Sequence, residues 1–93
     1  MIENVVIVFE SYQYSMLRGI LDSQTTRLIL MRDDYDVYGL ASPEMTIYEV
    51  KSDHTLLYDT LARKANELLS PRSKQYIFLS LEDLVELWKR NEI

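Results

Sequence analysis

The chain has no cysteine, one histidine, two glycines and two prolines among its 93 residues. The absence of cysteine excludes disulfide bonds and thiolate metal sites, and a single histidine excludes a histidine-rich zinc site. Two glycines leave no glycine-rich phosphate loop. Because nothing in this composition needs an oxidising compartment, we expect the protein to be cytoplasmic.

Long hydrophobic runs are also missing. The apolar run at residues 5–9 is too short to cross a bilayer, and it lacks the basic start of a secretion signal. The chain is nevertheless 47% hydrophobic and has seven tyrosines, a composition typical of a globular protein. A chain of this length has room for one hydrophobic core, so we predict a single domain over residues 1–93 with no membrane contact.

Charge is distributed unevenly along the chain, whose net charge is −5. Residues 33–59 hold seven acids and one base, Lys51, so this segment's charge of −6 exceeds that of the whole chain. Residues 63–74 then contain four bases and one acid. We therefore expect a bipolar molecule. Such asymmetry suits a protein partner at least as well as a nucleic acid, because phosphate binding relies on an excess of Lys and Arg.

Hydrophobic patterning predicts five strands and three helices. The strands are expected at residues 5–9, 28–31, 37–41, 45–50 and 76–79, and the helices at residues 11–21, 53–69 and 81–88. Three consecutive strands joined by short turns favour an antiparallel meander. The order β-α-β-β-β-α-β-α thus predicts an α+β two-layer sandwich, with a mostly antiparallel sheet of four to five strands and three helices. A ferredoxin-like split β-α-β is the alternative if one meander strand is absent.

The same patterns predict the core and the oligomeric state. Core positions are expected at Val6, Val8, Leu17, Ile20, Leu28, Leu30, Ile47, Leu57, Leu61, Leu68, Ile77, Leu84 and Trp88. The two apolar helix stripes and the edge strands have more hydrophobic surface than one small sheet can cover. We therefore predict a homodimer, the commonest symmetric assembly.

The acidic middle segment predicts a binding surface. Carboxylates spaced along a hairpin edge can occupy the positions of duplex phosphates and attract a basic groove, with interleaved tyrosines as interface anchors. The predicted binding residues are Asp33, Asp34, Tyr35, Asp36, Tyr38, Glu44, Glu49, Asp53 and Asp59.

In size, acidity, lack of cysteine and the DDYD cluster at residues 33–36, the chain resembles the small DNA-mimic and anti-restriction proteins of tailed phages. That resemblance implies a non-enzymatic inhibitor that docks on a basic partner protein, for example a DNA-binding protein. It implies no cofactor and no metal, and the host cell cytoplasm as location if the protein is viral.

A second pattern, Asp36 followed by Glu49 and Lys51, looks like the PD-(D/E)xK nuclease superfamily. There, an acid at the start of one strand meets an acid-x-Lys on the next. Alternation along a strand puts Glu49 and Lys51 on one face. This resemblance implies magnesium-dependent phosphodiester hydrolysis, with Asp36 and Glu49 holding the metal and Lys51 positioning or activating water. The non-catalytic alternative is an exposed charge pair on an edge strand.

Overall fold

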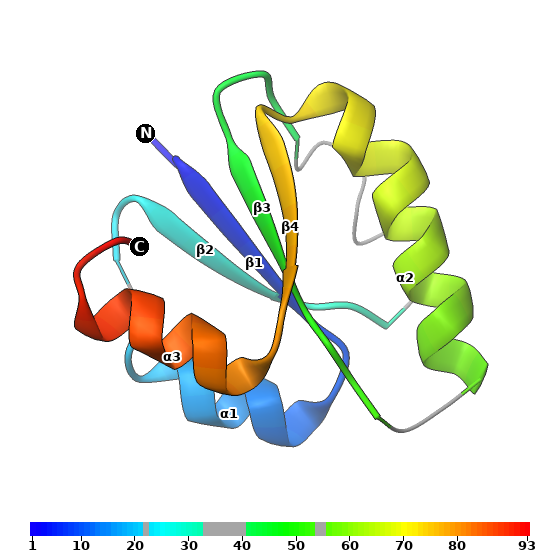
Figure 1. The fold of residues 1–93 in the computed structure, drawn as a ribbon, viewed down its shortest axis with the longest axis horizontal. Helices are drawn as coiled ribbons and strands as arrows, with labels where there is room; N and C mark the ends of the chain where they lie inside the picture. Colours follow the sequence, from blue (N-terminus) through cyan, green and yellow to red (C-terminus); the bar gives the residue numbers. More distant parts are fainter. Residues whose placement is uncertain (22, 33–40, 54–55) are drawn as a thin grey trace.

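A computed structural model describes residues 1–21, 23–32, 41–53 and 56–93. Figure 1 shows a twisted sheet with helices on both sides. The elements in chain order are β1 (Asn4–Val8), α1 (Ser11–Arg18), β2 (Thr26–Leu30), β3 (Thr46–Val50), α2 (Leu56–Leu69), the one-turn 3-10 helix η2 (Ser70–Arg72), β4 (Gln75–Leu79) and α3 (Leu81–Lys89).

The four strands lie in the order β2-β1-β3-β4, and every neighbouring pair is parallel. The expected mostly antiparallel sheet is therefore wrong, and so is the split β-α-β alternative. Strands β2 and β3 lie on either side of β1 and do not pair. Parallel strands that do not pair cannot be the two arms of one hairpin, so β2 and β3 do not belong to an antiparallel meander. The expected strand at residues 37–41 lies outside the described residues except for Ala41, which is in no strand.

The parallel arrangement follows from the burial of the two central strands. In β1, residues 5–8 are at most 1% exposed, and in β3 the side chains of residues 47–50 are all buried. Strands of a parallel sheet covered by helices on both faces are buried on both faces, so their sequences are continuous apolar runs without alternation. The run NVVIV is of this kind. The meander was predicted from consecutive short strands, but strands of an antiparallel sheet with one solvated face alternate between apolar and polar residues, and NVVIV does not.

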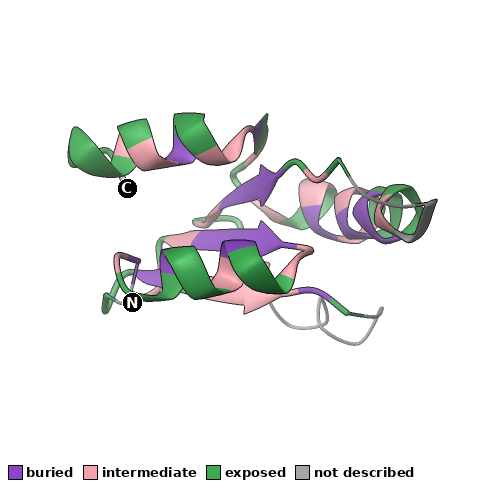
Figure 2. Ribbon diagram, turned by 90° about the horizontal axis from the view of Figure 1, so that it is seen from below, coloured by how far each residue is buried: buried purple, intermediate pink, exposed green. Residues whose placement is uncertain are grey.

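Two hydrophobic clusters, one on each face of the sheet, make three layers where two were expected. Figure 2 shows the buried segments, in purple, on the strands and on parts of the helices. On one face, α2 packs through Leu61, Ala65 and Leu69 against Val5, Ile7 and Ile47. On the other face, Leu17 of α1 and Leu84 of α3 pack against Val6, Val8, Tyr48, Val50 and Leu79. Three helices were expected and three α-helices are found, but they divide between the two faces.

Most of the predicted core is confirmed. Val6, Val8, Leu17, Ile47, Leu61 and Leu84 are buried, and Ile20, Leu28, Leu30, Leu68 and Ile77 are partly buried against the two clusters. The side chain of Leu57 lies outside what the structure describes. Trp88 was wrongly assigned to the core: it is 37% exposed, and its neighbour Leu87 packs against the cluster under α3 instead.

Candidate functional site

All four strands are parallel, so the segments that follow them emerge at the same edge of the sheet, here called the carboxyl edge. Glu10 follows β1, Lys51 and Asp53 follow β3, and Glu82 and Asp83 follow β4. Strand β2 ends at this edge too, just before Met31 and Arg32. Open parallel sheets bind ligands in the crevice outside the carboxyl ends, where neighbouring strands connect to opposite sides. That point lies between β1 and β3 here, because β1 leads to α1 on one face and β3 leads to α2 on the other.

Contacts across this point hold the two loops together. Gln13, in the first turn of α1, is 2% exposed, and its Nε2 donates a 3.0 Å hydrogen bond to the backbone oxygen of Lys51. The rings of Phe9 and Tyr58 meet edge to face, with their centroids 4.9 Å apart. The second amide atom of Gln13, Oε1, is buried and accepts no hydrogen bond from any described residue. Elements that are distant in sequence therefore contact one another at the point where β1 and β3 lead to opposite faces.

Acidic side chains lie at the N-termini of the helices, at the carboxyl edge of the sheet. Glu10 precedes α1, Asp59 lies in the first turn of α2, and Glu82 and Asp83 lie in the first turn of α3. Acids at these positions are favourable because each helix has a partial positive charge at its N-terminus. The opposite, amino edge carries both signs of charge. Its bases include Arg18 and Lys89 in the last turns of α1 and α3, and Arg72 and Lys74 before β4. Its acids include Glu3 before β1 and Glu44 before β3. The same placement of charges thus stabilises the helices and makes the carboxyl edge acidic.

A groove of about 450 Å³ opens beside this edge, between α2 and the β3–β4 side of the sheet; we call it the α2 groove. From β3 and the loop after it come Glu49, Lys51 and Asp53. Helix α2 contributes Tyr58, Asp59 and Arg63, and β4 contributes Phe78. The volume lies within the range of about 300–1,000 Å³ common for ligand pockets.

Glu49 lies in this groove as a buried carboxyl, 1% exposed. Its Oε1 accepts a 2.7 Å hydrogen bond from the Tyr76 hydroxyl, and its Oε2 accepts one of 3.2 Å from Tyr58. Burial raises the pKa of Glu49, and the two tyrosine hydrogen bonds act in the opposite direction. Burial and the Glu49 carboxylate together raise the pKa of Tyr58 to about 12 and that of Tyr76 further.

The structure corrects the expected position of Glu49. It was predicted on an exposed binding surface, with an exposed edge-strand pair as the alternative. Strand β3 is central in the sheet, with β1 on one side and β4 on the other, so its side chains are covered by helices on both faces. A residue so deeply buried cannot contact a partner directly.

The other predicted binding residues do not form one surface in the part of the chain that is described. Asp53 and Asp59 are exposed and line the α2 groove together. Glu44 is exposed but precedes β3, at the amino edge. Asp33, Asp34, Tyr35, Asp36 and Tyr38 lie outside the described residues.

The nuclease pattern gains little from the geometry. Glu49 and Lys51 line one groove, but Asp36 lies outside the described residues. Both carboxylate oxygens of Glu49 are already hydrogen-bonded to tyrosines. Within the described ranges, no three acidic or histidine side chains are placed to hold a metal ion.

Sequence patterns missed Gln13, Tyr58, Tyr76 and Phe78, because their roles depend on contacts between separate elements. One available signal was overlooked: the run TIYEV contains a single acid among apolar residues. A buried acid needs hydrogen-bond donors, so tyrosines elsewhere in the chain were candidates for its partners.

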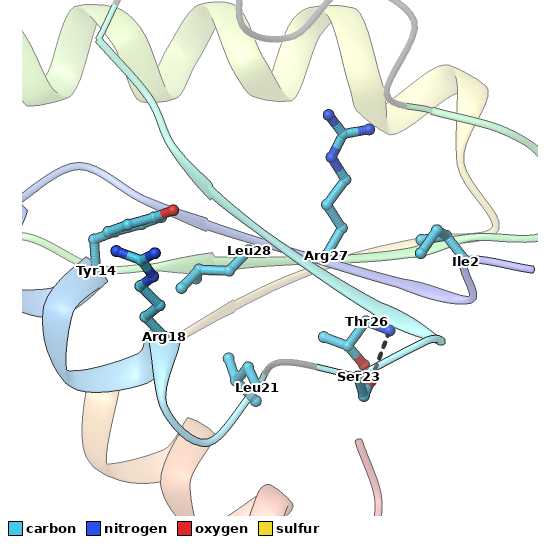
Figure 3. Close-up of a pocket in the computed structure, with 8 residues that line it drawn as sticks. All are labelled: Ile2, Tyr14, Arg18, Leu21, Ser23, Thr26, Arg27 and Leu28. Atoms are coloured by element: carbon cyan, nitrogen blue, oxygen red, sulfur yellow. Dashed lines mark hydrogen bonds between the residues drawn. The ribbon is translucent and has the colours of Figure 1, made fainter.

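A second cavity, of about 390 Å³, lies at the outer edge of β2 (Figure 3). Ser23 and Thr26 meet there through a 3.0 Å hydrogen bond from the Thr26 backbone N–H to Ser23 Oγ. Figure 3 shows Arg27 extending to the other side of β2 from these residues, away from Arg18. The two arginines therefore do not converge on one ligand position.

Comparison of the chain with protein-family models, with curated proteins and with solved structures gave no match. Within the described residues, no helix is both long and apolar enough to cross a membrane. The geometry of the carboxyl edge is therefore the basis for a functional assignment.

Proposed function

We propose that this protein is a non-enzymatic binding module that docks the acidic carboxyl edge of its sheet on a basic partner protein. The observation that carries the proposal is the meeting of acids from separate elements, Glu10, Asp53, Asp59, Glu82 and Asp83, at one edge. Sequence separation hides this surface, since these residues span 74 positions from first to last (10–83). Parallel strands bring them to one end of the molecule.

Exposed aromatic side chains at this edge can supply binding energy, which surface charges alone provide only weakly. Tyr12, at the start of α1, is 53% exposed, and Phe78, at the end of β4, is 51% exposed. Interfaces draw most of their binding energy from a few aromatic or arginine anchors, whereas charges at the rim mainly steer the encounter and select the partner. An acidic edge that contains two exposed rings has both components.

The partner class follows from the sign of the charge. Proteins that bind nucleic acids expose basic grooves, and carboxylates on a rigid scaffold can compete for those grooves with phosphates. In the sequence, Asp33, Asp34 and Asp36 follow β2 directly and add to the acids available for such competition. Inhibition of a DNA-binding protein by mimicry of DNA is the most specific form of this proposal.

The test compares charge reversals at the two ends of the molecule. A partner captured with immobilised protein is purified, and its affinity is measured for the unchanged protein and two variants. Asp53→Lys with Asp59→Lys should weaken binding at least tenfold, whereas Glu3→Lys with Glu44→Lys, the same change in charge at the amino edge, should leave it within twofold. Binding by the unchanged protein should also weaken steeply with salt, because exposed charges are screened beyond about 8–10 Å at physiological ionic strength.

Duplex DNA added as a competitor tests the mimicry itself. It should displace the protein from a DNA-binding partner if both occupy one groove. Equal losses from the two charge reversals, or binding that is insensitive to salt, would contradict docking through the carboxyl edge.

A further inference from the structure

The charges of the α2 groove do not cancel. At its rim, the acids Asp53 and Asp59 are matched in number by the bases Lys51 and Arg63. The remaining charged group is Glu49, whose hydrogen-bond partners are the neutral hydroxyls of Tyr58 and Tyr76. The groove therefore has one buried acid in excess over its bases.

This carboxylate is fixed in orientation. Its two oxygens accept hydrogen bonds from two different elements, α2 and β4, and Tyr58 is itself held by the ring of Phe9. A charge in a buried setting attracts an opposite charge more strongly than one in water, because less solvent screens it. Prior fixation also lowers the cost of ordering the site when a ligand binds.

An exposed aromatic ring lies next to this carboxylate. Glu49 and Phe78 are direct partners in the β3–β4 register, so their side chains leave the same face of the sheet beside each other. The Phe78 ring is 51% exposed and contacts the Tyr76 ring at a centroid distance of 5.1 Å. A planar guanidinium group stacks on such a face better than a compact ammonium group does, and the buried Glu49 carboxylate attracts its charge through space, without direct contact.

We propose that the α2 groove is a receptor for one arginine side chain of the basic partner, with Phe78 as the stacking surface and Glu49 as the buried counter-charge. This inference rests on the proposed function for the source of the arginine, but the groove is testable without that partner. Lys51 and Arg63 at the rim oppose a second cation, so the site takes one side chain and not a basic stretch.

The experiment uses the whole chain and N-acetyl-arginine amide as the probe, with binding followed through backbone amide chemical shifts. Saturable shifts are expected at groove residues such as Lys51, Arg63 and Phe78. N-acetyl-citrulline amide, a neutral analogue of the same shape, should cause none of them, and N-acetyl-lysine amide should bind at least threefold more weakly than arginine.

Two variants separate the charge from the stacking surface. Glu49→Gln keeps the shape and should weaken arginine binding at least tenfold. Phe78→Ala, at an exposed position, should weaken it several-fold and keeps the test valid if Glu49→Gln fails to fold. Glu44→Gln, which removes an exposed acid at the amino edge, is the matched control and should leave arginine binding unchanged.

Failure of this inference is distinguishable from failure of the proposed function. Citrulline shifts equal to those of arginine, or unchanged binding in Phe78→Ala, would overturn the arginine site even if charge reversal at Asp53 and Asp59 abolishes partner binding. Arginine binding that depends on Glu49 and Phe78, together with a partner insensitive to that charge reversal, would support the groove and overturn docking through the edge.

Discussion

The hydroxyl of Tyr76 donates a 2.7 Å hydrogen bond to Oε1 of Glu49, across 27 positions of sequence. With the weaker bond from Tyr58, it joins β3, β4 and α2 around one buried carboxyl. The α2 groove is open on the other side of this group. The stability of the fold and the chemistry of the groove therefore depend on the same side chain.

Removal of the Tyr76 hydroxyl should be costly. Tyr76→Phe leaves an oxygen of Glu49 buried without that donor, and a lost hydrogen bond to a charged group costs about 1–3 kcal/mol of unfolding free energy. Tyr58→Phe should cost less, because its hydrogen bond is longer. Urea unfolding measures both, and Tyr12→Phe at an exposed position, expected within about 0.5 kcal/mol, is the control. Equal costs for all three variants would contradict the network.

Glu49 should make stability depend on pH. Its folded pKa is raised, mainly by burial, so the folded state holds its proton at pH values where the unfolded chain has lost it. Folding stability therefore falls as pH rises above the ordinary glutamate range, until the folded carboxyl ionises as well. Glu49→Gln removes this contribution. Its stability relative to the unchanged protein should increase from pH 4 to pH 8, measured by urea unfolding.

The control for that experiment is Glu44→Gln, which removes an exposed acid from the amino edge. A stability difference for Glu49→Gln that stays constant with pH, or that falls as pH rises, would contradict a raised pKa at Glu49.

Leu61 tests the contact between α2 and the sheet. It is 8% exposed and belongs to the cluster with Val5, Ile7 and Ile47. Leu61→Ala should lower the free energy of unfolding by about 2–5 kcal/mol, the usual cost of a buried cavity. Met16→Ala on the exposed side of α1, 57% exposed, should change it by less than about 0.5 kcal/mol. A small effect at Leu61 would mean that α2 presents another side to the sheet.

The binding proposal predicts that the protein does not cleave DNA. Purified protein with magnesium or manganese should leave supercoiled plasmid intact, since both oxygens of Glu49 are hydrogen-bonded to tyrosines. Nicking that disappears in Lys51→Ala while metal binding persists would instead assign the groove to phosphodiester hydrolysis. The same plasmid incubated with the Asp83→Asn variant controls for a contaminating nuclease.

Dimerisation stays a prediction, and Trp88 offers a way to follow it. It is the single tryptophan of the chain and is 37% exposed on α3. If a second copy covers α3, tryptophan emission should shift to shorter wavelength with rising protein concentration, while sedimentation shows a twofold gain in mass. Sedimentation of a monomer at high concentration would remove the dimer.

The sequence predicted the helices and most of the core because both depend on local periodicity. Leu17, Leu61 and Leu84 each lie on an apolar helical stripe, and each is buried. Strand direction has a weaker local signal: the continuous apolar run NVVIV indicates burial on both faces, as in a parallel sheet, but it does not identify the neighbouring strands. The error in topology then affected the site: Glu49, assigned to an exposed position, lies on a central strand.

The acidic composition was visible in the sequence, but its arrangement was not. A continuous acidic hairpin was expected, and the described acids instead come together from the ends of separate strands. Asp59 was predicted from its place in the acidic segment, whereas Glu82 and Asp83 lie far from that segment in the sequence and were not predicted as binding residues. Their common position depends on parallel pairing, which no local pattern predicts.

The gathering of acids at the carboxyl edge, opposite an amino edge with acids and bases, gives the molecule an electric dipole in addition to its net charge of −5. In the field of a basic surface, a dipole experiences a torque, so the protein turns its acidic end forward before any contact forms. A larger share of collisions is then productive than random orientation would allow.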